Sequence, residues 1–396
     1  MRVLGVEERR ARLAVRHHLL PTSRTDDLTA IADDVVALHS SDPVTVYLSA
    51  ILRMAGPSLE AVTRALYDDR NLVRHHAMRR TLWVATPSAV RVLHAAATRA
   101  LVQPERRRTC QMLAASGVGD PDAWLDGARD LVLDDLARHG ASTARELGQR
   151  IPALARPLQL PSASQTDATQ AAHTRVMLGL GFAGEVVRVQ PTGSWVNGAY
   201  RYALADEWVP GGLGDLDGRE AAATLADRYL QRFGPATTVD LQWWTGWTKT
   251  ATVRALTDCG AVPVEADEGR AWLSAADEGS PPTEPWVAVL PSLDPTTMGW
   301  KQRDWYLPAT ATDAFDRNGN AGPTLWVDGR VVGAWAQHKD GRLLTHYFER
   351  VPQSRRDELG DRLAQLAEVV GGTRFTVRFP GRIQASILAK ADRELS

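Results

Sequence analysis

Residues 234–274, GPATTVDLQWWTGWTKTATVRALTDCGAVPVEADEGRAWLS, contain an order of elements that recurs along the chain. A helix predicted over residues 218–233 leads into it. PATTVDLQWWTG has a threonine-containing cap and a short amphipathic run, and TKTATVRALTDCG has the spacing of a further helix. VPVEADEGRAWLS then gives two strand-like runs around a turn. Three helices followed by a β-hairpin predict a winged helix.

The same order of elements is predicted within residues 7–100. Apolar residues at helical spacing predict a helix over residues 28–38. Pro43 opens a second helix, and Ser58 is placed to cap a third. Residues 81–84 have strand character. This part of the chain therefore also reads as helices followed by a hairpin.

The order recurs within residues 124–204. A helix is followed by HGASTARELGQRI, in which Ser142 or Thr143 caps a second helix and Glu146 is placed for a capping box. A third helix is predicted around residues 168–180. EVVRVQPTGSWVNGAYRYAL then gives two strand-like runs around a Gly/Asn-rich turn. The three regions form a weak, diverged internal repeat.

Residues 283–396 change character. WVAVLPSLD is typical of a buried strand, and PTLWVDGRVVGAWAQHKDGRLLTHYFERV predicts a meander with hairpin turns at residues 328–329 and 339–341. A helix over residues 352–370 and a strand over residues 373–379 complete the prediction. The simplest interpretation is a small β-rich, barrel-like domain.

The fold class predicted from these patterns is α+β, with three tandem winged-helix units and a C-terminal β-domain. A chain of 396 residues is long enough for several compact units. We predict domains at residues 1–110, 111–210, 211–282 and 283–396.

The formal net charge of −1 hides an uneven distribution. Residues 1–110 contain 17 arginines but only 11 aspartates and glutamates. Such an asymmetry permits one basic face on a nearly neutral protein, which suits binding to nucleic acid. Arginine is also the better phosphate ligand, because its planar fork donates parallel hydrogen bonds.

Other features exclude several classes of protein. Cys110 and Cys259 are far apart, so a disulfide framework and a cysteine zinc site are not expected. The apolar runs are short and interrupted, and the N-terminal stretch lacks a secretory pattern. No nucleotide-binding or metalloprotease motif occurs, so we expect no metal and no cofactor. We expect a cytoplasmic protein that does not contact membranes.

Four segments resemble the AlkZ/YcaQ-type winged-helix DNA glycosylases. RLAVRHHLL followed by VVALHSSDP is similar to the start of that family, and LVRHHAMRRTLWVATP is similar to its Arg-x-x-x-Met-Arg-Gly-Thr-Leu-His segment. VLPSLDPTTMGWKQRDWYL and GPTLWVDGRVVGAWAQHKDG are the most specific matches. The residues in register there are Asp294, Gly299, Arg303, Asp328, Gly329, Gly333 and Trp335. The resemblance implies a curved DNA-binding body and excision of alkylated bases, in repair or in self-resistance to a DNA-alkylating compound.

The family's catalytic signature is Gln-x-Gln or Gln-x-Asp, and with Asp42-Pro43 as anchor its two positions hold His39 and Ser41 here. Hydrolysis of the C1′–N bond needs a group that orients or deprotonates water and a group that stabilises the cationic sugar. His39 is suited to accept a proton from the attacking water. Ser41 is suited to hold that water by a hydrogen bond, and Asp42 to stabilise the developing cation or to orient His39. Alternatively, His39 lies on the inner face of the helix over residues 28–38, and Asp42 is an N-cap with Pro at the first helical position.

Further departures occur at Arg80 and Trp83, where the family has Gly and His. Candidate DNA-binding residues lie near the first hairpin, in the second hairpin, where Trp195 is a candidate wedge, and in the 301–303 segment. They are Arg74, Arg79, Arg80, Arg188, Ser194, Trp195, Asn197, Arg201, Lys301 and Arg303.

The first hypothesis is a monofunctional DNA glycosylase acting on double-stranded DNA that carries bulky or crosslinking N7-alkylguanine-type adducts. The second is a non-catalytic winged-helix DNA-binding protein or regulator, which the absent glutamines favour. A weakness of this second hypothesis is that regulators usually dimerise, and no heptad or long dimer helix is evident. We expect a monomer. The third is a protein that sequesters a hydrophobic drug.

Overall fold

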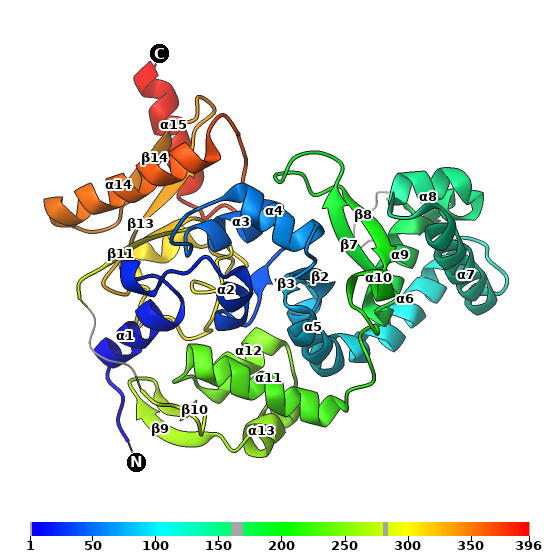
Figure 1. Cartoon of the computed structure of the whole chain (residues 1–396), viewed down its shortest axis with the longest axis horizontal. Helices are drawn as coiled ribbons and strands as arrows, with labels where there is room; N and C mark the ends of the chain where they lie inside the picture. The colour runs from blue at the N-terminus through cyan, green and yellow to red at the C-terminus, as the bar shows by residue number, and fades with distance from the viewer. Residues whose placement is uncertain (1, 160–168, 280–283, 396) are drawn as a thin grey trace.

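The first region of the computed structural model builds the loop that carries the candidate catalytic residues (Figure 1). The structure describes residues 2–159, 169–279 and 284–395. The elements of the first region are α1 (Val6–Arg16), η1 (Pro21–Ser23), α2 (Leu28–Asp34), β1 (Leu38–His39), α3 (Pro43–Ile51), α4 (Leu59–Tyr67), β2 (Val73–His76), η2 (Met78–Arg80), β3 (Leu82–Ala85), α5 (Pro87–Leu93), η3 (His94–Thr98), η4 (Arg99–Leu101) and α6 (Val102–Ala115).

The helix predicted over residues 28–38 is wrong in its second half. α2 ends at Asp34, because Val36 adopts a φ of 63° that a helix cannot continue through. The chain then turns into β1, which pairs antiparallel with β3. His39 therefore lies on a strand and not on the inner face of a helix.

The predicted caps in these regions are confirmed. The Asp42 side chain accepts from Val44 N at the start of α3, and the Ser58 hydroxyl accepts from Ala61 N at the start of α4. Thr143 and Glu146 form a reciprocal capping box at α8 (Ala144–Arg150).

The second region begins with α7 and ends with a hairpin. Its elements are α7 (Pro121–His139), β4 (Ser142–Thr143), α8, η5 (Pro152–Ala155), β5 (Pro157–Gln159), β6 (Thr169–Ala171), α9 (Ala172–Ala183), β7 (Val186–Pro191), β8 (Tyr200–Leu204) and α10 (Ala205–Trp208). The helix predicted over residues 168–180 is α9, shifted toward the C-terminus, and residue 168 lies outside the described residues.

The hairpins of the first two regions join in one six-stranded sheet of order β1-β3-β2-β7-β8-β4. The junction is an antiparallel pairing of Arg74 on β2 with Arg188 on β7. In Figure 1 this sheet connects the α7–α8 end of the molecule to the central helices α2, α3 and α4. The sheet crosses the predicted boundary at residues 110–111, and the domain boundaries remain a prediction.

The third region follows the order predicted from residues 218–274. Its helices are α11 (Gly218–Phe233), α12 (Thr238–Thr245) and α13 (Lys249–Asp258), and its hairpin is β9 (Val262–Ala266) with β10 (Gly269–Leu273). These predicted elements are confirmed. The predicted domain boundary at residues 282–283 lies outside the described residues.

The last region contains a four-stranded antiparallel sheet of order β11-β12-β13-β14, which is open and forms no closed barrel in the part of the chain that the structure describes. The left-handed turn at Asp328 and Gly329, with φ of 46° and 80°, joins β12 to β13 as predicted. The elements are β11 (Val287–Leu290), η6 (Ala309–Ala314), β12 (Thr324–Val327), β13 (Arg330–Gln337), β14 (Leu343–Tyr347), α14 (Gln353–Val370) and α15 (Gln384–Leu395).

The strand predicted over residues 373–379 is wrong. This segment has no strand partner and crosses from α14 toward the end of β1 as irregular chain, where its backbone bonds to the side chain of Asp42. The helix α15 that follows it was not predicted.

One hydrophobic core extends from the first region through the third region to the C-terminal sheet. Within it, Arg53 at the end of α3 forms a bidentate ion pair with Asp294, with N–O distances of 2.8 and 2.9 Å and both side chains fully buried. Ser49 and Thr296 complete the hydrogen bonds of this pair. The last turn of α3 is thereby fixed to the 291–306 segment.

We expect Arg53→Met to lower the free energy of unfolding by about 3–5 kcal/mol, because it leaves the buried carboxylate of Asp294 without its cation. Denaturant unfolding measures this change. The matched control is Arg138→Met, which removes an exposed pair with Asp134 and should cost less than about 1 kcal/mol. Equal effects of the two substitutions would contradict the assignment.

Candidate functional site

The loop that joins β1 to α3 carries His39, Ser41 and Asp42 at one end of the six-stranded sheet. His39 pairs with Trp83 across β1 and β3, and the two ring centroids are 4.6 Å apart. Ser40 N donates to Leu82 O at 2.8 Å and continues the pairing by one residue. The loop is therefore an extension of the sheet, and its backbone is fixed.

His39 is only 3% exposed. Its Nδ1 accepts from Ser41 N at 3.3 Å, and a backbone N–H can only donate, so in this arrangement the ring proton is on Nε2. Burial, with a smaller contribution from the positive charge of Arg79, lowers the pKa of His39 to about 3. At neutral pH the imidazole of the free protein is uncharged and is a weak base.

Asp42 is buried, and both of its carboxylate oxygens accept from backbone N–H groups. Oδ1 caps α3 through Val44 N at 3.2 Å, and Oδ2 accepts from Arg378 N at 2.8 Å. Burial raises the pKa of Asp42, and these hydrogen bonds oppose the rise. The N-cap interpretation of Asp42 is confirmed, and its predicted catalytic role remains a prediction.

Ser41 is half-buried and is the loop residue nearest to solvent. No protein hydrogen bond to its hydroxyl occurs among the described residues. Its carbonyl accepts from the Arg378 guanidinium at 3.4 Å. The hydroxyl is thus available to bind water.

The β7–β8 hairpin reaches the same end of the sheet. Trp195, predicted as a DNA wedge, packs against Tyr47 and Phe375 with ring centroids 5.3 and 6.0 Å away. Ser194 at the tip is exposed, and Asn197 accepts from Ala199 N within the turn. The hairpin therefore contacts α3 and the C-terminal segment.

The predicted arginines divide into buried and accessible groups. Arg74 is buried, donates to the Ser40 hydroxyl at 2.8 Å and lies over the Tyr200 ring. It therefore helps to hold the loop in place from within the protein. Arg188 lies over the ring of Tyr202. Arg201 bonds to Ala141 O and Glu146 at the far edge of the sheet, away from the loop.

Arg79 and Arg303 converge on the ring of Trp243, 4.3 and 5.0 Å from its centroid. Burial and the charge of Arg303 lower the pKa of Arg79 to about 10. Lys301 and Arg80 are exposed. Arg80 has a φ of 63°, the left-handed conformation that glycine adopts most easily, which fits the glycine of the family pattern at this position.

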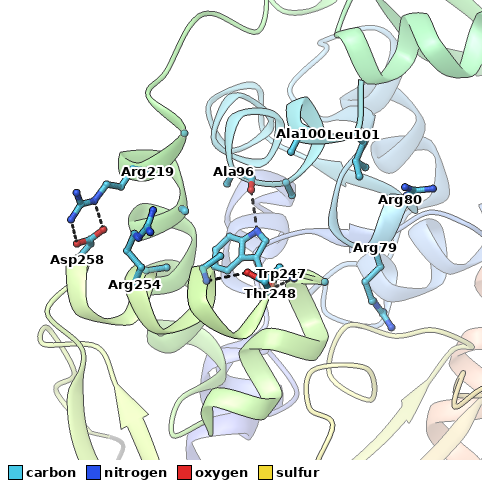
Figure 2. Close-up of a pocket in the computed structure, with 17 residues that line it drawn as sticks. Arg79, Arg80, Ala96, Ala100, Leu101, Arg219, Trp247, Thr248, Arg254 and Asp258 are labelled. Carbon is cyan, nitrogen blue, oxygen red and sulfur yellow. Dashed lines mark hydrogen bonds and ion pairs between the residues drawn. The ribbon is translucent and has the colours of Figure 1, made fainter. Parts of the chain in front are cut away.

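A pocket of about 660 Å³ opens beside Arg79 and Arg80. Figure 2 shows Arg79 and Arg80 on one side, Arg219 and Arg254 on the other, and Trp247 between them. The floor consists of small apolar side chains of η3, η4, α11 and α13. The pocket therefore has arginines at its rim and apolar side chains at its floor. It lies next to Arg79, whose charge lowers the pKa of His39.

Two pairings fix the far wall of this pocket. Arg219 forms a bidentate pair with Asp258 at 2.6 and 2.7 Å, and Trp247 Nε1 donates to Ala96 O at 3.0 Å. Sequence reasoning did not select Arg219 or Arg254. Arg254 could have been found, because it lies in the third helix predicted for the 218–274 region.

No group of three or more His, Cys, Asp or Glu side chains is placed to hold a metal ion in the described ranges. Within those ranges, no helix has both the length and the apolar character needed to cross a bilayer.

Comparison with known proteins gives a clear relationship. The profile of a family described as DNA glycosylase AlkZ-like matches residues 32–369. The chain belongs to this family. Its fold is similar to that of Streptomyces sahachiroi DNA glycosylase AlkZ, with a TM-score of 0.71 and 22% identity over 96% of this chain and 100% of that one. A search of curated protein sequences found no match.

The resemblance inferred from the four sequence segments is therefore confirmed. Membership of the AlkZ-like family places the chain among DNA glycosylases, which are hydrolases that act on glycosidic bonds. The Asp294 of the family-like motif has a structural role here, because it holds Arg53 in the core.

We expect the free energy of unfolding to fall as pH decreases from 6.5 toward 4. Burial keeps the pKa of His39 and His76 at about 3 and of His94 at about 4, so the folded protein keeps these rings neutral while the unfolded chain takes up protons. Each such histidine contributes stability that is complete above its unfolded pKa and decreases by about 1.4 kcal/mol per pH unit below it. Denaturant unfolding at several pH values measures the slope.

His39→Gln should reduce the slope of unfolding free energy against pH by about 1.4 kcal/mol per pH unit, which is the contribution of one bound proton. An unfolding free energy that stays constant from pH 7 to pH 5 would contradict the neutral state of these rings.

Proposed function

We propose that this protein is a monofunctional DNA glycosylase that hydrolyses the N-glycosidic bond of alkylated purines, of the N7-alkylguanine type, in double-stranded DNA. The observation that supports it best is that the family match over residues 32–369 includes the loop of His39 and Ser41, at the positions of the catalytic signature. We interpret the three helix–hairpin regions as winged-helix units that face the duplex.

Hydrolysis of the glycosidic bond of an N7-alkylated guanine requires few catalytic groups from the protein. An N7-alkylated guanine is cationic and leaves readily, so the site has to position water and tolerate an oxocarbenium-like sugar. In our proposal the Ser41 hydroxyl holds the water, and the His39 imidazole orients it through Nε2–H. To take the proton of that water, the ring has to adopt the other tautomer, in which Nε2 is free and Nδ1 no longer accepts from Ser41 N. A pKa of about 3 suits the orienting role in the free protein.

DNA changes this electrostatic setting. A phosphate bound to Arg79 would cancel part of the positive charge that lowers the pKa of His39, and it would add a negative charge nearby. Both effects raise the pKa of the imidazole in the complex. We propose that His39 becomes a better proton acceptor when substrate is bound.

The pocket in Figure 2 supports a second part of the proposal, which is that its arginines bind the DNA backbone. Arg80 and Arg254 approach it from η2 and α13, and no carboxylate forms an ion pair with either of them among the described residues. Sugar-phosphate offers an apolar face for the alanine-rich floor and an anion for the rim.

A non-catalytic DNA-binding protein is the second candidate. The burial of His39 favours it, because a ring that is 3% exposed reaches substrate only if the loop or its neighbours move. The two candidates differ in one assay, the release of free base and formation of an abasic site from a duplex with N7-methylguanine. Only the glycosylase produces both.

We expect His39→Ala to slow single-turnover excision by about 100-fold or more, because it removes the group that orients or deprotonates water. His39→Gln restores the family's residue and should retain excision. Binding to the undamaged duplex serves as the control and should stay unchanged in both variants. An excision rate for His39→Ala equal to that of the unaltered protein would refute the assignment.

We expect Arg80→Ala and Arg254→Ala each to weaken duplex binding and to reduce the slope of log affinity against log salt by about 0.9, the effect of one lost phosphate contact. Fluorescence anisotropy between low and moderate salt measures the slope. Arg138→Ala on α7 is the matched control, since it removes one exposed arginine far from the pocket. A slope that changes as much in the control as in the pocket variants would exclude a local phosphate site.

A further inference from the structure

The irregular segment after α14 places an arginine at the mouth of the candidate active-site loop. Arg378 lies beyond residue 369, where the family match ends. Its backbone N donates to Asp42 Oδ2 at 2.8 Å, and Ser292 Oγ donates to Phe379 O at 2.7 Å. These two bonds fix the segment over the start of α3.

The side chain of Arg378 lies between the loop and the β7–β8 hairpin. Its Nη1 donates to Ser41 O at 3.4 Å, and its guanidinium lies against Gly198, where a Cβ atom would overlap it. Gly198 does not have a positive φ, so it is the position of the guanidinium that leaves no room for a side chain there. The loop, the hairpin and the C-terminal segment therefore meet at one cation.

The charge of Arg378 is not neutralised by an ion pair within the described residues. Arg378 is exposed, and no carboxylate lies within ion-pair distance of it in the described part of the chain. The segment is held by the backbone N–H of residue 378, while the side chain contributes one long hydrogen bond. Most of the guanidinium donors remain available to an anion.

We propose that Arg378 binds a backbone phosphate next to the target nucleotide, so that the segment around it forms part of the DNA-binding surface. The proposal rests on the proposed function, since a DNA strand whose sugar lies at Ser41 carries a phosphate within a few ångströms of it. Arg378 is a positioning residue: it holds the strand and does not take part in bond cleavage.

The first test measures the salt dependence of binding to an undamaged duplex. Arg378→Ala should weaken binding and lower the salt slope by about 0.9. Arg374→Ala is the matched control, because Arg374 is exposed in the same segment but bonds to Asp340 O on the side of the C-terminal sheet. Since the backbone bond to Asp42 survives, the melting temperature of Arg378→Ala should equal that of the unaltered protein. A salt slope identical in both variants and in the unaltered protein would overturn the proposal.

The second test locates the phosphate. Single methylphosphonates, which are uncharged, replace each phosphate around an N7-methylguanine. In the unaltered protein one position should weaken binding by about 10-fold, as expected for loss of a charge-assisted hydrogen bond, and Arg378→Ala should be insensitive at that position. The same loss in both proteins at every position would overturn the proposal. Arg378→Lys should restore part of the sensitivity.

The Gly198→Ala variant tests whether the position of the Arg378 guanidinium matters, because it displaces this group while keeping its charge. The added methyl displaces only the far end of a flexible side chain, so the variant should fold normally but lose the methylphosphonate effect. Retention of the full effect would show that the guanidinium does not act from its place against the hairpin.

The outcomes separate the two proposals. If the unaltered protein releases no base but Arg378→Ala still lowers the salt slope, the glycosylase activity is refuted and the phosphate contact stands. If base is released and the slope of Arg378→Ala is unchanged, the activity stands and the contact is refuted.

Discussion

Two buried carboxylates hold helix α3, one at each end, and the rest of the site depends on them. Asp42 caps the first turn and also accepts from the backbone of Arg378, while Asp294 accepts from Ser49 in the last turn and pairs with Arg53 just beyond it. A buried ion pair adds little net stability over an apolar contact of the same volume, but removing one partner is costly. The pairing therefore fixes where α3 lies, and with it the direction of the loop that precedes it.

The electrostatic setting of the loop differs between the free protein and a complex with DNA. Arg79 and Arg303 share the ring of Trp243, and no ion pair neutralises either of them in the described ranges. Burial and, to a smaller extent, the charge of Arg303 lower the pKa of Arg79, and the charge of Arg79 adds to the burial that keeps His39 neutral. Clustered cations without counter-charges are unfavourable in a free protein and favourable beside phosphate. The repulsion between Arg79 and Arg303 therefore lowers the stability of the free protein.

The six-stranded sheet explains how distant parts of the chain meet at the loop between β1 and α3. Because β2 pairs with β7, the second hairpin extends from the same sheet as β1 and reaches over α3. The irregular C-terminal segment closes the arrangement from the other side through Phe375 and Arg378. The β7–β8 hairpin and the C-terminal segment, which are far apart in sequence, thus meet beside the loop that contains Ser41.

The local elements and the family could be predicted from the order of residues along the chain. Caps at Asp42 and Ser58, the capping box of Thr143 with Glu146 and the turn at Asp328 depend on hydrogen bonds or φ angles within a few residues, so neighbouring letters encode them. Three outcomes could be seen only in the folded chain: α2 stops at Asp34, residues 373–379 form no strand, and Arg378 lies beside Ser41. Those outcomes depend on partners such as β3 and Asp42, and periodicity along one segment carries no information about which distant backbone satisfies its polar groups.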